Sequence, residues 1–194
     1  MLGILRHRDS GIPPIIGASL QIGIGTTLIY NRPNNWGENY SKTAFIWTAA
    51  ELGGAKTING ISLYHRQYST PAGQGNQVVS LAHVVQSVFD STPAINFSDM
   101  TLSDLTIVKP TFSYPISGNN VWTQLNFTTP FVYNGTSNLM LIWEHNDADW
   151  DSTAGGADGS IQTYKGMTAA SSAPLVQTNN GVFLSTRPNI KFHY

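Results

Sequence analysis

Residues 121–127 have the sequence VWTQLNF, and this short stretch decides the fold class. An extended chain places its odd-numbered residues on one face and its even-numbered residues on the other. The first face carries Val121, Thr123, Leu125 and Phe127, and the second carries Trp122, Gln124 and Asn126. One face is therefore mostly apolar and the other mostly polar, which predicts a β-strand with one side in a core. Residues 189–194 alternate in the same way.

The composition extends this prediction to the whole chain of 194 residues. Gly, Ser, Thr and Asn make up 71 residues, and these types favour turns, caps and extended backbone over long helices. Charged residues are 11% and aromatic residues 11%, so a coiled coil and intrinsic disorder are both disfavoured. Nine short strands are predicted, at residues 44–47, 58–64, 78–85, 105–108, 121–127, 139–143, 160–164, 181–184 and 189–194. This spacing predicts an all-β fold, a two-sheet antiparallel β-sandwich.

The chain has the length of one domain with an extended N-terminal arm. Residues 1–25 are rich in Ile and Gly and contain Pro13-Pro14. They are predicted to be an arm that docks onto a neighbouring subunit, or simply a lead-in strand, and residues 26–194 the sandwich. Asn59-Gly60, residues 117–120 and Asn134-Gly135 are predicted turns, and residues 48–52 a single helical turn that ends on glycine.

Charge and cysteine content exclude several classes of function. Ten Lys and Arg against eleven Asp and Glu leave no basic field for nucleic acid. The absence of cysteine excludes disulfides, cysteine-ligated zinc and a thiol nucleophile. No apolar run is long enough to span a membrane, and the first residues do not resemble a secretory signal. The sequence also contains no nucleophile elbow, phosphate loop or zinc helix, and its five histidines lack ligand spacing. We therefore expect a protein that is not an enzyme and needs no cofactor.

Residues 144–158 have the strongest local chemical character. They hold five of the eleven carboxylates and no Lys or Arg. The residues that echo a calcium loop are Asp147, Asp149, Asp151 and Asp158. Ser152 stands at the position of the turn glycine and Asp158 at that of the bidentate glutamate, so a calcium site here would be weak. A plain solvated acidic loop and a catalytic carboxylate pair are the alternative interpretations.

Aromatic side chains in polar, loop-like surroundings form a second candidate site. They are Trp36, Tyr40, Tyr68 and Trp150. Exposed rings of this kind can stack on sugars, which indicates carbohydrate binding. The alternative interpretation is that they anchor loops on the rim of the sandwich.

Three segments resemble β-sandwich domains that are common in secreted surface proteins of Bacteroidota. Residues 40–52 and 58–61 resemble the opening of those domains, an aromatic residue followed by A-A-E-L and then a glycine-linked I-x-x-I strand. Residues 130–139, PFVYNGTSNL, resemble their P-F-x-Y-N-G-T-x-N-L segment, and residues 187–192, RPNIKF, their closing strand. The resemblance implies a jelly-roll-like sandwich that serves as a non-catalytic adhesive or accessory module, with no catalytic residues to carry over.

Such a module without a recognisable signal or sorting domain fits a virion protein of a bacteriophage that infects Bacteroidota. We expect a capsid decoration, head fibre or tail protein that contacts other virion proteins through residues 1–25, as a homo-oligomer or in a larger assembly. A host surface glycan is the expected external ligand. The alternative is an extracellular carbohydrate-binding or adhesion module of a bacterial cell-surface protein.

Overall fold

The computed structural model describes residues 17–30, 33, 38–67, 75–89, 105–114, 118–148, 156–175 and 181–194. About two thirds of the described residues are in β-strands. The strands are β1 (Ser19–Ile22), β2 (Thr27–Tyr30), β3 (Tyr40–Trp47), β4 (Lys56–Gln67), β5 (Gln77–Val84), β6 (Thr106–Phe112), β7 (Val121–Tyr133), β8 (Asn138–His145), β9 (Gly156–Ser171), β10 (Val182–Pro188) and β11 (Ile190–His193). The helical turn α1 (Ala49–Leu52) follows β3.

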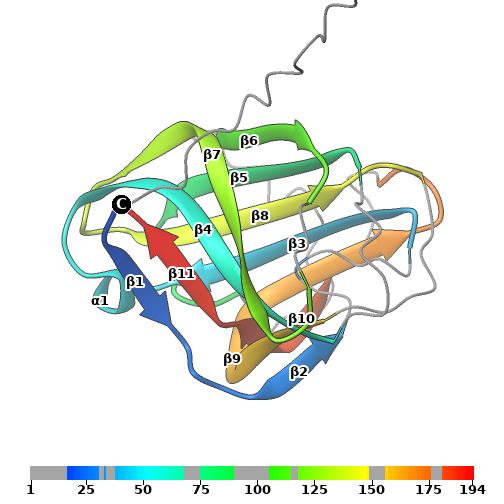
Figure 1. Ribbon diagram of the computed structural model, residues 1–194, viewed down its shortest axis with the longest axis horizontal. Helices are drawn as coiled ribbons and strands as arrows, with labels where there is room; N and C mark the ends of the chain where they lie inside the picture. Colours follow the sequence, from blue (N-terminus) through cyan, green and yellow to red (C-terminus); the bar gives the residue numbers. More distant parts are fainter. Residues whose placement is uncertain are drawn as a thin grey trace, which may run out of the picture.

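The strands form two antiparallel layers, and their order is that of a jelly roll. The front layer in Figure 1 has the order β1-β11-β4-β7, and the back layer has the order β3-β8-β5-β6. These eight strands follow the double-sheet jelly-roll arrangement. β9 joins the two layers because it pairs with β4 at its start and with β3 at its end. β2 and β10 add to β9. The predicted all-β sandwich is therefore confirmed.

The main core lies between the two layers. Phe45 and Trp47 of β3 and Trp143 of β8 face Leu125 of β7 and Phe192 of β11, and all five belong to one buried cluster. Alternation along each strand produces this cluster, since every second residue points inward. The front layer shows the alternation most clearly, as the pattern of residues 121–127 predicts.

A second apolar cluster covers the outer side of the back layer. Ala44, Ile46 and Ile142 are fully buried there, and Phe89 and Phe183 pack in the same cluster. The backbone N–H of Phe89 donates to the Tyr164 carbonyl at 2.7 Å, which fixes the covering segment. β3 and β8 are therefore buried on both faces, and this explains their continuous apolar sequences.

All nine predicted strands occur, and so does the helical turn at residues 48–52. β2, of four residues, was not predicted, whereas β1, also of four residues, lies within residues 1–25, for which a lead-in strand was one of the interpretations. The Asn59-Gly60 turn prediction is wrong, because β4 continues through these residues. The register with β7 shifts here, because β4 advances from Ile58 to Gly60 while β7 advances from Phe131 to Asn126, so the extra residues of the irregularity lie on β7.

The described part of the predicted arm, residues 17–25, belongs to the sandwich. β1 pairs with β11, and Ile22 lies in the main core. Leu20 packs against that core, whereas Ile24 is 87% exposed. Residues 1–16, including Ile12, Ile15 and Ile16, lie outside the described residues. The sheet thus begins at Ser19, within the segment predicted to be an arm.

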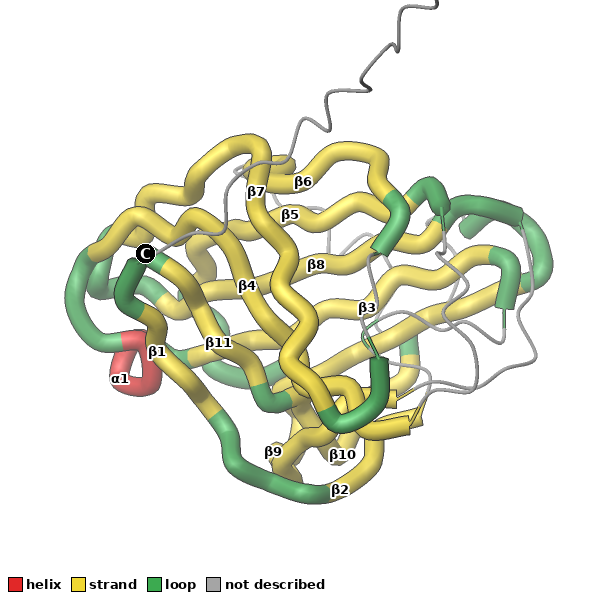
Figure 2. The backbone as a smooth tube through the Cα atoms, in the orientation of Figure 1, coloured by secondary structure: helices red, strands yellow, loops and turns green. Residues whose placement is uncertain are grey.

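The two ends of the sandwich are formed by different parts of the chain. At one end the Tyr194 N–H donates to the Ala18 carbonyl at 3.0 Å, so both ends of the described chain meet there. Figure 2 shows α1 and the C-terminus on this same side. We call it the terminal end. No helix in the described ranges is long and apolar enough to cross a membrane.

Candidate functional site

The opposite end of the sandwich, which we call the loop end, gathers the connections that contain most of the predicted site residues. Ser41 and Gln77 both pair with His145, so β3, β5 and β8 start or finish here. His65 pairs with Val121 and Ala157, which brings β4, β7 and β9 to the same end. The connections 31–37, 68–74, 115–117 and 149–155 therefore all begin and finish at the loop end.

The predicted site residues divide into described and undescribed ones. Those outside the described residues are Trp36, Tyr68, Asp149, Trp150 and Asp151. Tyr40 opens β3, lies opposite Ser171 of β9 and is partly exposed. The described residues that flank Trp36, Tyr68 and Trp150 in the sequence lie at the loop end, as Tyr40 does.

The interior beneath the loop end is polar. His65 and Tyr114 are both buried, and the His65 Nε2 lies 2.7 Å from the Tyr114 hydroxyl. Burial lowers the pKa of His65 to about 4 and raises the pKa of Tyr114 well above its usual range. His65 is therefore neutral at pH 7, and this pair stabilises the fold as an uncharged hydrogen bond.

A second buried pair lies next to the first. The Trp143 Nε1–H donates to the Gln77 side-chain oxygen at 2.6 Å, and the Trp143 ring contacts the Tyr114 ring edge-on at 5.0 Å between centroids. His145 follows on the same strand and is also fully buried. Polar groups on β4, β5, β8 and the segment after β6 thus lie within the core at this end.

The grouping of Ser41, His145 and Asp147 has the residue types of a hydrolytic triad. Ser41 is opposite His145 in the ladder, and the His145 Nε2 lies 2.6 Å from an Asp147 carboxylate oxygen. Ser41 and His145 are each 0% exposed, so they present no surface to a substrate. A hydrolase site needs a nucleophile that a substrate can reach.

The rim of the loop end is held by asparagine side chains. Asn76 donates from its amide to the Asn146 carbonyl, and the Asn146 N–H donates back to the Asn76 carbonyl at 3.1 Å. The Asn39 amide donates to the Ala148 carbonyl at 3.1 Å. Asn76 and Ala148 have positive φ values of 49° and 60°, which produce tight turns at these strand ends. The connections thus start from fixed anchors.

The two described residues of the predicted calcium site already have side-chain partners. Asp147 contacts His145, as described above, and Asp158 of β9 forms an ion pair with Arg66 at 3.3 Å. Within the described residues no three His, Asp or Glu side chains are grouped to hold a metal ion. Calcium binding at residues 147–158 stays a prediction, and an ion at Asp158 would have to compete with Arg66.

The segments that carry the family resemblance meet at the terminal end, in structural roles. Glu51 of the A-A-E-L segment accepts hydrogen bonds from the Thr48 N–H at 2.8 Å and from Arg187 of the closing segment at 2.5 Å. Arg187 also donates to the Ile46 carbonyl and lies over the Trp47 ring. Burial raises the pKa of Glu51, but the hydrogen bonds from Arg187 and Thr48 outweigh burial and hold it well below its usual range.

The PFVYNGTSNL segment also serves the fold. The Asn134 side chain accepts hydrogen bonds from the backbone N–H groups of Thr136 and Ser137, and the Tyr133 hydroxyl donates to the Ser137 carbonyl. Gly135 has φ 79° and packs directly on the backbone of Ala55. The residues of this segment that resemble the family therefore stabilise the turn after β7 and its packing on Ala55.

The outer face of the front layer carries a group of side chains that no sequence prediction named as a site. We call it the sheet-face cluster; it consists of Tyr64, Trp122, Gln124, Asn126 and Lys191. All five are partly exposed. The alternation in residues 121–127 already places Trp122, Gln124 and Asn126 on the side away from the core. Sequence alone could not show that Tyr64 and Lys191 lie beside them, since that depends on strand pairing.

No family model and no curated protein matches the sequence of this chain.

Proposed function

We propose that the protein is a non-catalytic structural and adhesive module, a virion component of a bacteriophage that infects Bacteroidota. The observation that carries the proposal is the separation of the two ends of the sandwich. The described chain begins and finishes at the terminal end, whereas the described residues that flank Trp36, Tyr68 and Trp150 in the sequence lie at the loop end. A module attached through residues 1–25 would hold its loop end away from the particle.

The fold and the interior support a role without catalysis. Double-sheet jelly rolls are used in capsid and lectin domains, although a fold by itself does not define a function. Among the described residues, Ser41 and His145 form the grouping with the residue types for hydrolysis, and both are buried beneath the loop end. Turnover of polysaccharides that disappears in an Asp147→Asn variant would contradict this part of the proposal.

Mass spectrometry of purified phage particles tests the virion assignment. Peptides of this chain should be present in particles purified by density gradient, in a constant ratio to the major capsid protein. A protein found in the lysate but absent from the particles would contradict the assignment.

A second candidate function is a carbohydrate-binding or adhesion module of a bacterial surface protein. The sheet-face cluster favours it, because aromatic rings beside amide groups are a common surface for sugars. Fractionation of the source bacterium separates the two candidates, since a surface protein would be found in the outer membrane or medium of uninfected cells.

A further inference from the structure

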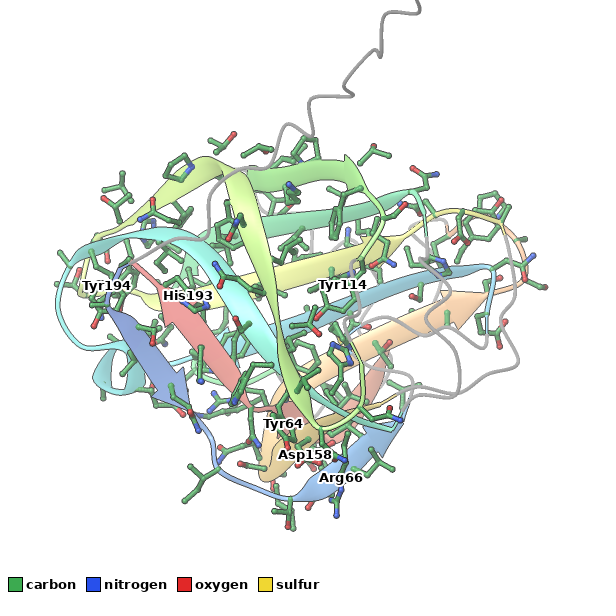
Figure 3. The ribbon with its side chains drawn as sticks, in the orientation of Figure 1. Tyr64, Arg66, Tyr114, Asp158, His193 and Tyr194 are labelled. Carbon is green, nitrogen blue, oxygen red and sulfur yellow. The ribbon has the colours of Figure 1, made fainter. Side chains whose placement is uncertain are left out.

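The sheet-face cluster has two aromatic rings at its centre. Tyr64 of β4 lies opposite Trp122 of β7 in the ladder, and their ring centroids are 5.5 Å apart at an interplanar angle of 68°. Figure 3 shows Tyr64 on the front layer, near the Arg66 and Asp158 pair. Both rings point away from the core, since their neighbours Leu63 and Thr123 are buried. An edge-on aromatic pair in this position presents apolar surface to the solvent.

Amide groups lie next to the rings on the same face. The Gln124 side chain donates to the Asn126 side-chain oxygen at 2.6 Å. Among the described residues these two side chains make no other hydrogen bond. The Gln124 side-chain oxygen and the Asn126 side-chain amide hydrogens can therefore still pair with a ligand. Paired amides of this kind both donate to and accept from sugar hydroxyls.

Lys191 supplies a positive charge to the cluster. Its Nζ lies 4.2 Å from the centre of the Trp122 ring. Across the described part of the chain no carboxylate comes within ion-pair distance of this ammonium group. A lysine held against an aromatic ring keeps its charge available to an anionic ligand.

The whole front layer has the same sign of charge. β1, β4, β7 and β11 contain three cations, Lys56, Arg66 and Lys191, and no Asp or Glu. The complete chain has a formal net charge of −1. These strands hold three of the ten Lys and Arg residues of the chain, and Arg66 is paired with Asp158 of β9. Lys56 and Lys191 therefore give a layer without acidic residues of its own a positive charge, which favours an anionic partner on this face.

We propose that the sheet-face cluster binds an acidic polysaccharide, one that carries carboxylate or sulfate groups. A pyranose ring packs on Tyr64 and Trp122, Gln124 and Asn126 hydrogen-bond to its hydroxyls, and its anionic group pairs with Lys191. The proposal gives a ligand class to the adhesive role in the proposed function and rests on that role. It places the glycan site on the sheet face and not at the loop end.

Affinity electrophoresis and calorimetry of the full chain test this proposal. The probes are four acidic polysaccharides (polygalacturonate, alginate, hyaluronate and heparin) and two neutral ones (dextran and pullulan), all in EDTA. At least one acidic probe should bind at least about tenfold more tightly than either neutral one. The affinity for this acidic probe should fall as the salt concentration is raised from about 50 to about 300 mM, a range around the physiological value of about 0.15 M, because salt screens exposed charges.

Two variants locate the site. Trp122→Ala should weaken binding by at least about tenfold, as loss of an aromatic anchor does at other interfaces. Lys191→Gln should weaken it by about threefold or more and flatten the salt dependence, since the chain length is kept and the charge removed. Tyr164→Ala and Lys109→Gln are matched controls on β9 and β6, strands outside the front layer, and should bind like the parent. Unchanged melting temperatures confirm that each variant is folded.

Each contrary result overturns the proposal. These results are no binding to any acidic probe, equal binding to neutral probes, or full affinity in folded Trp122→Ala. Loss of binding in Trp150→Ala with full affinity in Trp122→Ala would move the glycan site to the loop end. Presence of the chain in purified particles despite any of these results leaves the virion assignment intact, so the two proposals fail separately.

Discussion

At the scale of single residues, several buried polar side chains among the described residues are hydrogen-bonded in pairs. His65 pairs with Tyr114, Trp143 with Gln77, and Thr43 with Thr168 at 2.9 Å. A buried polar group without a partner costs about 1–3 kcal/mol, so each pair depends on both members. The pairs explain how a sandwich with a polar interior at one end is still stable.

His65 should make the stability depend on pH. Its pKa is lowered from 6.5 to about 4 in the folded state, so below pH 6.5 the unfolded chain takes up a proton that the folded chain does not. The free energy of unfolding should therefore decrease from pH 6.5 to pH 4, by at most about 3 kcal/mol from this residue. Urea unfolding of the parent and of His65→Gln, at half-unit steps of pH, measures the effect. Parallel curves for the two proteins would contradict it.

The Glu51–Arg187 pair should contribute more to stability than a surface pair. In Glu51→Gln the Arg187 side chain, 4% exposed, loses its carboxylate partner, and we expect a loss of about 2–3 kcal/mol. Because the pKa of Glu51 is lowered, this contribution is present above the ordinary pKa of glutamate and decreases as the pH falls below it. Glu144→Gln, which breaks the more exposed pair with Lys42, is the matched control and should cost under about 1 kcal/mol. Equal losses in the two variants, measured by urea unfolding, would refute this.

At the scale of elements, the turn after β7 depends on one glycine. A Cβ atom at Gly135 would collide with the Ala55 backbone, and the φ of 79° is unfavourable for any other residue type. Gly135→Ala should lower the free energy of unfolding by about 2–3 kcal/mol. Gly54, where nothing lies within 4 Å of an added Cβ, is the matched control, and Gly54→Ala should change stability by less than about 0.5 kcal/mol. Thermal unfolding of Gly135→Ala and Gly54→Ala measures the two losses of stability, and equal losses would contradict this prediction.

The connection between β8 and β9 carries the calcium prediction. If Asp147, Asp149 and Asp151 bind a calcium ion, we expect a dissociation constant of about 10⁻⁴ to 10⁻³ M. CaCl₂ at 5 mM, about five-fold or more above that constant, should then raise the melting temperature slightly relative to EDTA. Calorimetric scans in the two buffers measure this. Identical melting temperatures would leave a solvated acidic loop.

The strands could be predicted from sequence because alternation and turn residues are local signals. The sequence did not predict β2, because four residues are too few to show a period and its pairing with β9 is not local. For β1 it left a lead-in strand and a docking arm as alternatives, because the pairing with β11 is not local either. The same limit applies to the candidate site. Trp122 could be assigned to the outer face, but its neighbours Tyr64 and Lys191 come from β4 and β11 and are known only from the order of the strands.

At the scale of the whole molecule, the account is one of a sandwich with two unlike ends and one basic face. The two ends of the described chain meet at the terminal end, the predicted site residue Tyr40 lies at the loop end, and the front-layer strands contain three cations and no acidic residue. In this arrangement attachment and recognition use separate surfaces. Changes to residues 1–16 should therefore affect assembly without affecting the fold.

The most direct test of this account is removal of residues 1–16 followed by sedimentation velocity and thermal unfolding. The truncated chain keeps β1, which pairs with β11 and places Ile22 in the core, so its melting temperature should match that of the full chain. We expect the full chain to sediment as an assembly and the truncated chain as a monomer. A truncated chain that is folded and still assembles like the full chain would contradict attachment through the N-terminal segment.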